Sequence, residues 1–184
     1  WVQVGADIDG EATSDNSGWS VSLSSDGSRV AIGARGNDGN GTRSGHVRIY
    51  NYNGSAWVQV GADIDGEAAD DYSGNSVSLS SDGSRVAIGA TGNDGNGSNS
   101  GHVRIFSYTP SGVSSWTQVG ADIDGEAAND SSGYSVSLSS DGSRVAIGAR
   151  GNDGNGSNSG HVRIFSYTPS GVTSWTQVSG DIDG

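Results

Sequence analysis

The sequence lacks three residue types altogether: it has no cysteine, no methionine and no lysine, since its nine basic residues are all arginine. Without cysteine there is no disulfide framework, no thiolate metal site and no thiol nucleophile. Without lysine, Schiff-base chemistry and a P-loop lysine are excluded. Because residue 1 is not methionine, we expect the 184 residues to be part of a longer chain or assembly.

Positive charge and hydrophobic residues are also scarce. The formal net charge is −12, which argues against nucleic acid and anionic membranes as partners. Hydrophobic residues make up 32% of the chain and no apolar run approaches the length of a membrane span, so we expect no membrane insertion. Such a composition is typical of disordered chains unless a repeat supplies order.

The feature that supplies order is repetition. The same segment begins at four tryptophans, which are 56, 59 and 59 residues apart: Trp1, Trp57, Trp116 and Trp175. The repeats 57–115 and 116–174 differ at six positions. Repeats of this length stack one supersecondary unit on the next, so the composition does not indicate disorder.

Each repeat contains four short segments in which apolar and polar residues alternate, as in a β-strand. Around the first repeat they are residues 20–24, 29–34, 46–50 and 57–60. An Asp-Gly pair between the first two segments predicts a tight hairpin. Four antiparallel strands in about 59 residues match one blade of a β-propeller. A β-solenoid would need shorter, parallel coils, and a β-sandwich would not explain the repetition.

The sequence therefore predicts an all-β chain of propeller blades, each a four-stranded antiparallel sheet, with three repeats plus an extra outer strand. The predicted divisions are the outer strand and its connection at 1–18, and blades at 19–74, 75–133 and 134–184. Three blades are too few for a closed propeller, and Trp1–Gly10 and Trp175–Gly184 are copies of one segment. Either the chain is cut from a longer one, or the spare strand pairs with a neighbouring molecule, in a filament where contacts do not close.

Each repeat contains a segment that resembles a known family. The run SGYSVSLSSDGSRVAIGARGNDGNGSNSGHVRIF (132–165) is similar to the FG-GAP repeat, with Ser132-Gly133 at the Phe-Gly element and Gly148-Ala149-Arg150 at the Gly-Ala-Pro element. The resemblance recurs in all three repeats and implies the propeller of integrin α subunits and of bacterial surface proteins. The family's DxDxDG calcium loop has no counterpart here, because the short segment SSDGS joins the first two strands.

Acidic residues gather on the connections that we expect at one edge of the blades. The loop after the second strand reads D-G-N-G-S/T, which resembles the first half of a calcium loop, and the connection D-I-D-G-E could add carboxylates. Calcium is therefore the candidate cofactor, and its predicted ligands are Asp38, Asn40, Asp94, Asn96, Asp153, Asn155, Asp7, Asp9, Asp63, Asp65, Asp122 and Asp124. Alternatively, these are ordinary turn residues and surface charge.

Each repeat has one histidine at the start of its third strand, His46, His102 or His161. Because these residues lie one blade apart, we expect half-buried strand residues rather than a metal cluster. We expect the recurring tryptophans to be packing anchors, with sugar stacking as the alternative. The repeats differ at the acidic edge, and the predicted ligand contacts there are Trp19, Tyr134, Arg35 and Arg150.

Five asparagines lie in N-x-S/T sequons, which mark candidate glycosylation sites. They are Asn40, Asn53, Asn96, Asn129 and Asn155. Three of them occupy one equivalent loop position, so glycans would decorate one face. Chance followed by duplication would give the same pattern.

From these patterns and the resemblance we expect a non-catalytic extracellular or cell-surface module with a structural or adhesive role. Its expected partners are other copies of the same repeat, glycans and surface proteins. The alternative is a calcium-dependent propeller that binds carbohydrate or protein, with one site per blade. We do not expect an enzyme, because a catalytic centre needs one unlike set of residues, whereas each polar group here recurs in every repeat.

Overall fold

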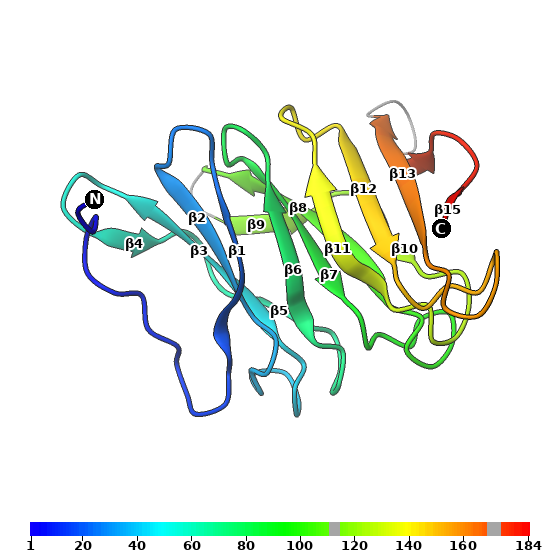
Figure 1. The fold of residues 1–184 in the computed structure, drawn as a ribbon. Coiled ribbons are helices and arrows are strands. Elements are labelled where there is room, and N and C mark those ends of the chain that lie inside the picture. Colours follow the sequence, from blue (N-terminus) through cyan, green and yellow to red (C-terminus); the bar gives the residue numbers. More distant parts are fainter. Residues whose placement is uncertain (111–114, 169–173) are drawn as a thin grey trace.

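The computed structural model describes residues 1–110, 115–168 and 174–184. Three antiparallel sheets stand side by side in chain order, with the N-terminus at one end of the row and the C-terminus at the other (Figure 1). This is the predicted propeller-like, all-β architecture with three repeated sheets. The described residues include no helix long and apolar enough to cross a membrane.

Every sheet is built from five strands, and we call the three sheets blades 1, 2 and 3. Blade 1 consists of β1 (Ser17–Leu23), β2 (Arg29–Ala34), β3 (His46–Tyr52), β4 (Trp57–Gln59) and β5 (Ile64–Asp65). Blade 2 consists of β6 (Ser73–Leu79), β7 (Arg85–Ala90), β8 (His102–Thr109), β9 (Ser115–Gln118) and β10 (Ile123–Asp124). Blade 3 consists of β11 (Ser132–Leu138), β12 (Arg144–Ala149), β13 (His161–Thr168), β14 (Ser174–Gln177) and β15 (Ile182–Asp183).

The first four strands of each blade pair in chain order. The fourth strand expected from the sequence is split into two short strands, both of which pair with the third strand. In blade 1, β4 and β5 both pair with β3, so a break interrupts the fourth strand of the sheet. We predicted an outer strand and its connection at residues 1–18, but β1 begins at Ser17 and residues 1–16 form no strand. The reason is that such a strand pairs with the third strand of its own blade, and no described third strand precedes them.

The Ser-Gly element starts the first strand of each blade with an irregular register. In β6 the register shifts between Ser73 and Ser76, and Gly74 has a φ of +82°. A β-carbon at Gly74 would lie 2.5 Å from the carbonyl oxygen of His46 in blade 1. Glycine is required there because the first strand of one blade approaches the backbone of the preceding blade closely.

The hydrophobic core lies between the blades rather than within one of them. A cluster between blades 1 and 2 joins Ala31, Val47, Ile49 and Ile64 to Val77, Leu79, Val86, Ile88 and Phe106. A second cluster repeats this arrangement between blades 2 and 3. Aliphatic residues of one blade thus meet aliphatic and aromatic residues of the next, as in two sheets packed face to face.

The two ends of the row lack a neighbouring blade. Val21 and Leu23 of β1 are 64% and 60% exposed, whereas Val77 and Leu79 at the same positions of β6 are 8% and 7% exposed. At the other end, Ile182 of β15 is 54% exposed. These ends therefore present the same apolar faces that are buried between the blades.

Candidate functional site

The loops after the second strand and the connections into the first strand lie together at one edge of the blades. Backbone hydrogen bonds join them, as between the Asp70 amide and the Thr42 carbonyl at 2.8 Å. We call this the loop edge, and it comprises residues 5–16, 35–45, 61–72, 91–101, 120–131 and 150–160.

One cavity at the loop edge draws its walls from all three blades. It has a volume of about 380 Å³ and is lined by Trp19, Arg35, Asn75, Tyr134 and Arg150. Trp19, Asn75 and Tyr134 occupy the same position near the start of β1, β6 and β11. The repeated architecture thus turns three equivalent positions toward a shared space.

The two arginines of this cavity stack on aromatic rings. The Arg35 guanidinium carbon lies 3.5 Å from the centre of the Trp19 ring, and that of Arg150 lies 4.5 Å from the Tyr134 ring. Arg35 Nη1 also donates to Asn75 Oδ1 at 3.3 Å, while Asn75 Nδ2 donates to the Tyr134 carbonyl at 3.2 Å. These contacts run from blade 1 through blade 2 to blade 3 and hold the cavity walls in place.

The charge of the cavity is positive. Within the described part of the chain, neither Arg35 nor Arg150 has an ion pair. Arg43 of the same edge is instead paired with Asp70 at 2.6 Å. In a chain of net charge −12, two guanidinium groups without carboxylate partners around one cavity form a site that favours an anion.

This cavity is also where the repeats differ from one another. Of the six differences between 57–115 and 116–174, two are Asn75 against Tyr134 and Thr91 against Arg150. One further pair, 114 and 173, lies outside the described residues. The four residues predicted as ligand contacts therefore meet in one place, and Asn75 joins them.

A second constellation recurs in each blade and was not predicted from the sequence. The imidazole of the third strand faces a glutamate from the connection into the first strand and an aspartate that follows the fourth strand. We call these the His–carboxylate clusters, and their members are Glu11, His46 and Asp63; Glu67, His102 and Asp122; Glu126, His161 and Asp181.

The histidines are buried, not half-buried as we expected. His46, His102 and His161 are 1%, 1% and 5% exposed, because the connection into the first strand passes over each of them. In blade 2, burial and then the Arg104 guanidinium lower the pKa of His102 below its ordinary value. A signal was present in the sequence, since glutamate and histidine recur with the same period. It was missed because the two residues lie in different predicted elements.

The residues predicted as calcium ligands do not form one set. Asp38 accepts from the Arg43 backbone amide at 2.7 Å and stabilises its own loop, whereas the Asn40 side-chain amide donates to the Gly66 carbonyl at 2.8 Å and joins that loop to the connection into blade 2. Their equivalents behave alike: Asp94, Asn96, Asp153 and Asn155. Asp63 and Asp122 belong instead to the His–carboxylate clusters.

The remaining predicted calcium ligands lie on the strands and connections beside the clusters. Asp7 accepts from Gln3 at 2.8 Å. The carbonyls of Asp9, Asp65 and Asp124 accept from Arg48, Arg104 and Arg163.

Two other sequence features have structural roles. The Trp116 indole donates to the Val60 carbonyl of the preceding blade at 2.8 Å and packs against the core between blades 1 and 2, as expected of an anchor. Among the sequon asparagines, Asn53 accepts three hydrogen bonds that close the turn between β3 and β4. Asn129 has a φ of +68°, which asparagine tolerates better than most residues.

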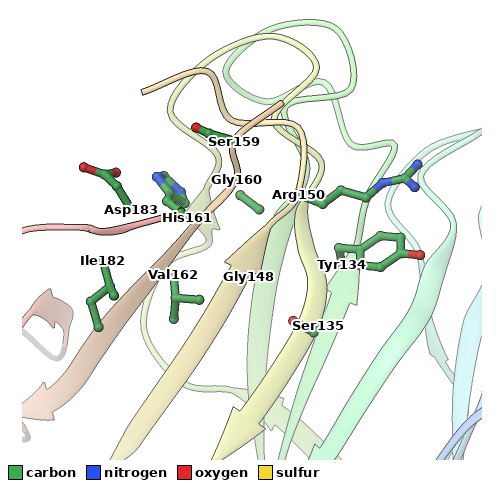
Figure 2. A pocket seen from close by; sticks show the side chains of 12 residues that line it. Tyr134, Ser135, Gly148, Arg150, Ser159, Gly160, His161, Val162, Ile182 and Asp183 are labelled. Carbon is green, nitrogen blue, oxygen red and sulfur yellow. The ribbon is translucent and has the colours of Figure 1, made fainter. Parts of the chain in front are cut away.

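A pocket of about 430 Å³ lies at the free end of blade 3 (Figure 2). Its walls include Ser135, Gly148, Gly160, Val162 and Ile182, and we call it the slot. The equivalent positions of blades 1 and 2 are filled by the Ser-Gly element of the next blade. The slot is thus an unfilled contact between blades rather than a pocket shaped by unlike residues.

The sequence profile of the FG-GAP repeat matches residues 7–50, 62–106 and 121–165, one match for each blade. The chain belongs to the FG-GAP repeat family. No curated protein matches it.

Two solved structures share this propeller fold. One is a Bacteroides uniformis protein provisionally described as a 6-phosphogluconolactonase, with 13% identity and a TM-score of 0.59 over 89% of this chain and 39% of that one. The other is a periplasmic gluconolactonase from Pseudomonas aeruginosa, with 14% identity and a TM-score of 0.51 over 92% of this chain and 46% of that one. The FG-GAP chain spans less than half of either protein.

These neighbours correct our functional expectations. Because propellers of this fold include proteins named as lactonases, neither the non-catalytic adhesion module nor the calcium-dependent binding propeller stands, and the expectation that the chain is not an enzyme is wrong. The cavity at the loop edge brings unlike residues of the three blades together. A location outside the cytoplasm agrees with the family and with the periplasmic neighbour.

Proposed function

We propose that this chain supplies the substrate-binding blades of a propeller enzyme that opens the ring of an anionic sugar lactone. The observation that carries the proposal is the cavity of Trp19, Arg35, Asn75, Tyr134 and Arg150, where the otherwise repeated blades present unlike residues. The names of the two structural neighbours supply the substrate class.

The chemistry of the cavity suits such a ligand. A guanidinium group can hold a phosphate or carboxylate through two parallel hydrogen bonds, and Arg35 and Arg150 have no competing carboxylate among the described residues. The exposed rings of Trp19 and Tyr134 can pack against the C–H face of a sugar. The Asn75 amide can bond a hydroxyl group.

Lactone hydrolysis needs the addition of water to the ester carbonyl and cleavage of the ring C–O bond, and the proton that the water loses passes through solvent to the departing ring oxygen. Negative charge develops on the carbonyl oxygen as water adds. A guanidinium group that is already fixed by stacking on an aromatic ring can stabilise that charge without reorganising. We assign this role to the arginine that does not hold the anionic group of the substrate.

The test is binding of 6-phosphogluconate, the open-chain product, by titration calorimetry. We expect saturable binding that weakens by at least about tenfold in Arg35→Ala and in Arg150→Ala, since each loses a charged hydrogen bond. Arg43→Ala is the matched control, because that arginine lies on the same edge but is already paired with Asp70. Gluconate, which lacks the phosphate, shows which anionic group is recognised.

The catalytic part is tested by hydrolysis of 6-phosphogluconolactone above its spontaneous rate. Lack of binding, or equal binding by wild type and both cavity variants, would overturn the proposal. We place this activity at the cell surface or outside the cell, which detection of the chain in cell-surface and medium fractions of the source organism would test.

A further inference from the structure

We infer that each His–carboxylate cluster binds a divalent transition-metal ion such as Zn²⁺ or Mn²⁺. This inference does not rest on the proposed function, because the clusters and the arginine cavity involve different residues. Imidazole and carboxylate together are typical of transition-metal sites, whereas calcium takes oxygen ligands.

The distances within each cluster are close to those of a metal site. In blade 2, His102 Nδ1 lies 3.9 Å from Glu67 Oε2 and 3.8 Å from Asp122 Oδ2. Tetrahedral ligands at zinc distances would lie about 3.3–3.6 Å apart, so the cluster needs a contraction of a few tenths of an ångström. These separations are too long for direct hydrogen bonds but leave room for an ion between the three groups.

The buried imidazole points to a missing ligand. Neither Nδ1 nor Nε2 of His102 has a hydrogen-bond partner, and the same holds for His161. A buried polar atom without a partner is rare in folded proteins. An ion between the imidazole and the two carboxylates would give Nδ1 its partner.

The neighbouring residues orient the two carboxylates. Gln118 donates to Asp122 Oδ1 at 2.6 Å, which leaves Oδ2 directed to the histidine. Arg104 contacts Glu67 Oε1 at 3.4 Å and leaves Oε2 facing the same point. Both carboxylates are partly exposed, so an ion can enter from solvent. Contacts of this kind fix the ligands of metal sites.

The experiment titrates Zn²⁺, and separately Mn²⁺, into the EDTA-treated 184-residue chain by calorimetry. We expect three equivalents per chain. His102→Gln should reduce the number to two, and Asp122→Asn should weaken one site by at least about tenfold, because it replaces a charged ligand by a neutral one. Asp122→Asn keeps the Oδ1 atom that Gln118 bonds, which makes it the variant of choice should His102→Gln unfold.

Asp94→Asn is the matched control, because Asp94 lies in a neighbouring loop and not in a cluster. It should keep all three equivalents. Absence of saturable binding of either metal, or three undiminished equivalents in both cluster variants, would overturn the inference.

A second and independent observation concerns the slot in blade 3. We propose that it receives the Ser17–Gly18 element of a second copy of this chain. In the two filled counterparts, Ser20 Oγ donates to the Gly74 carbonyl at 2.8 Å and Ser76 Oγ donates to the Gly133 carbonyl at 2.7 Å. Ser135 lines the slot at the corresponding position, and a β-carbon at Gly18 would meet no atom within 4 Å.

The exposed faces of blades 1 and 3 carry the same residues that make the contacts between neighbouring blades within the chain. Val21 and Leu23 would cover the exposed face of blade 3 as Val77 and Leu79 cover blade 1. Residues 1–10 of the second copy would have to leave, since Trp175–Gly184 of the first copy already occupies the equivalent place. Trp1 and Val2 are exposed, and the bonds that residues 1–10 would give up are those from Trp57 to the Val4 carbonyl and from Arg48 to the Asp9 carbonyl. Val178 and Asp183 of the first copy have the equivalent carbonyls to replace them.

Sedimentation of the 184-residue chain over a range of concentrations tests the contact. We expect species heavier than a monomer, in a ring if the contact closes and in a filament if it does not. Gly148→Ala should reduce association at least about tenfold, because its methyl group would fill the space of the incoming Gly18 carbonyl. Gly180→Ala is the control, since the other repeats have alanine there and nothing lies within 4 Å.

A monomeric wild-type chain at all concentrations would overturn this second proposal. Equal association of wild type and Gly148→Ala would also overturn it, because the contact would then lie elsewhere.

Discussion

The guanidinium of Arg35 lies 3.5 Å from the centre of the Trp19 ring, the shortest cation–aromatic distance found in the described residues. The same group reaches Asn75 of the next blade. In blade 3 the Arg150–Tyr134 pair repeats the stacking, whereas blade 2 has Thr91 and Asn75 at these positions. The positive charge around the cavity is therefore incomplete at its middle blade.

Adding the missing guanidinium should strengthen the anion site. Thr91→Arg would place a third arginine at the position of Arg35 and Arg150, within reach of Tyr134. We expect the affinity for 6-phosphogluconate to rise about fivefold, or about 1 kcal/mol, as for a partly exposed charge. Titration calorimetry at low and physiological salt measures the change.

Thr117→Arg is the control for this substitution, because Thr117 is exposed on β9 and not part of the cavity. It adds the same charge to the chain and should leave the affinity within about twofold of wild type. If both variants strengthened binding equally, the effect would be one of net charge and not of position.

Much of the fold could be predicted because the same pattern is repeated three times. Alternation, the Asp-Gly hairpin and the recurring tryptophan predict four strands per repeat, and the structure places them at β1–β4 and their equivalents. The short β5 could not be predicted, since two residues carry no periodic signal. The absence of a strand at residues 1–16 depends on pairing partners that no local pattern reveals.

The candidate site was predicted in part, for a physical reason. Trp19, Tyr134, Arg35 and Arg150 were recognised because they vary in a nearly constant background, and the structure brings them together. The His–carboxylate clusters were missed because residues of three different elements form them, and proximity of that kind depends on tertiary packing.

The glycines of the second strands should differ in importance by blade. A β-carbon at Gly89 would collide with the Gly133 carbonyl of the next blade, whereas one at Gly148 would meet the flexible Ser135 hydroxyl. We expect Gly89→Ala to lower the free energy of unfolding by at least about 2 kcal/mol and Gly148→Ala by less than about 1 kcal/mol. Urea unfolding of the monomer at low concentration, followed by tryptophan fluorescence, provides the comparison, and equal losses in the monomer would contradict close approach of the blades.

Leu23 and Leu79 occupy equivalent positions in the first strands of blades 1 and 2, so they form a second pair of matched substitutions. Leu79 is buried between blades 1 and 2, and Leu23 is exposed at the free end. Leu79→Ala should cost about 2–4 kcal/mol because it leaves a cavity, and Leu23→Ala should cost less than about 1 kcal/mol in the monomer. Thermal unfolding at low concentration measures both; a comparable loss for Leu23→Ala would mean that this face is covered in solution.

The Asp-Gly hairpins should make stability fall in acid. Hydrogen bonds from Ser24 and Ser28 lower the pKa of Asp26 to about 2, and equivalent bonds lower the pKa of Asp82 and Asp141. Because the folded state has the lower pKa, the stabilisation is complete above the unfolded pKa of about 3.9 and is lost as the pH falls toward 2. Urea unfolding at pH 7, 4, 3 and 2 should show this loss, and the triple variant Asp26→Asn, Asp82→Asn, Asp141→Asn should show a smaller one. An unchanged pH dependence in the triple variant would assign the acid sensitivity to other carboxylates.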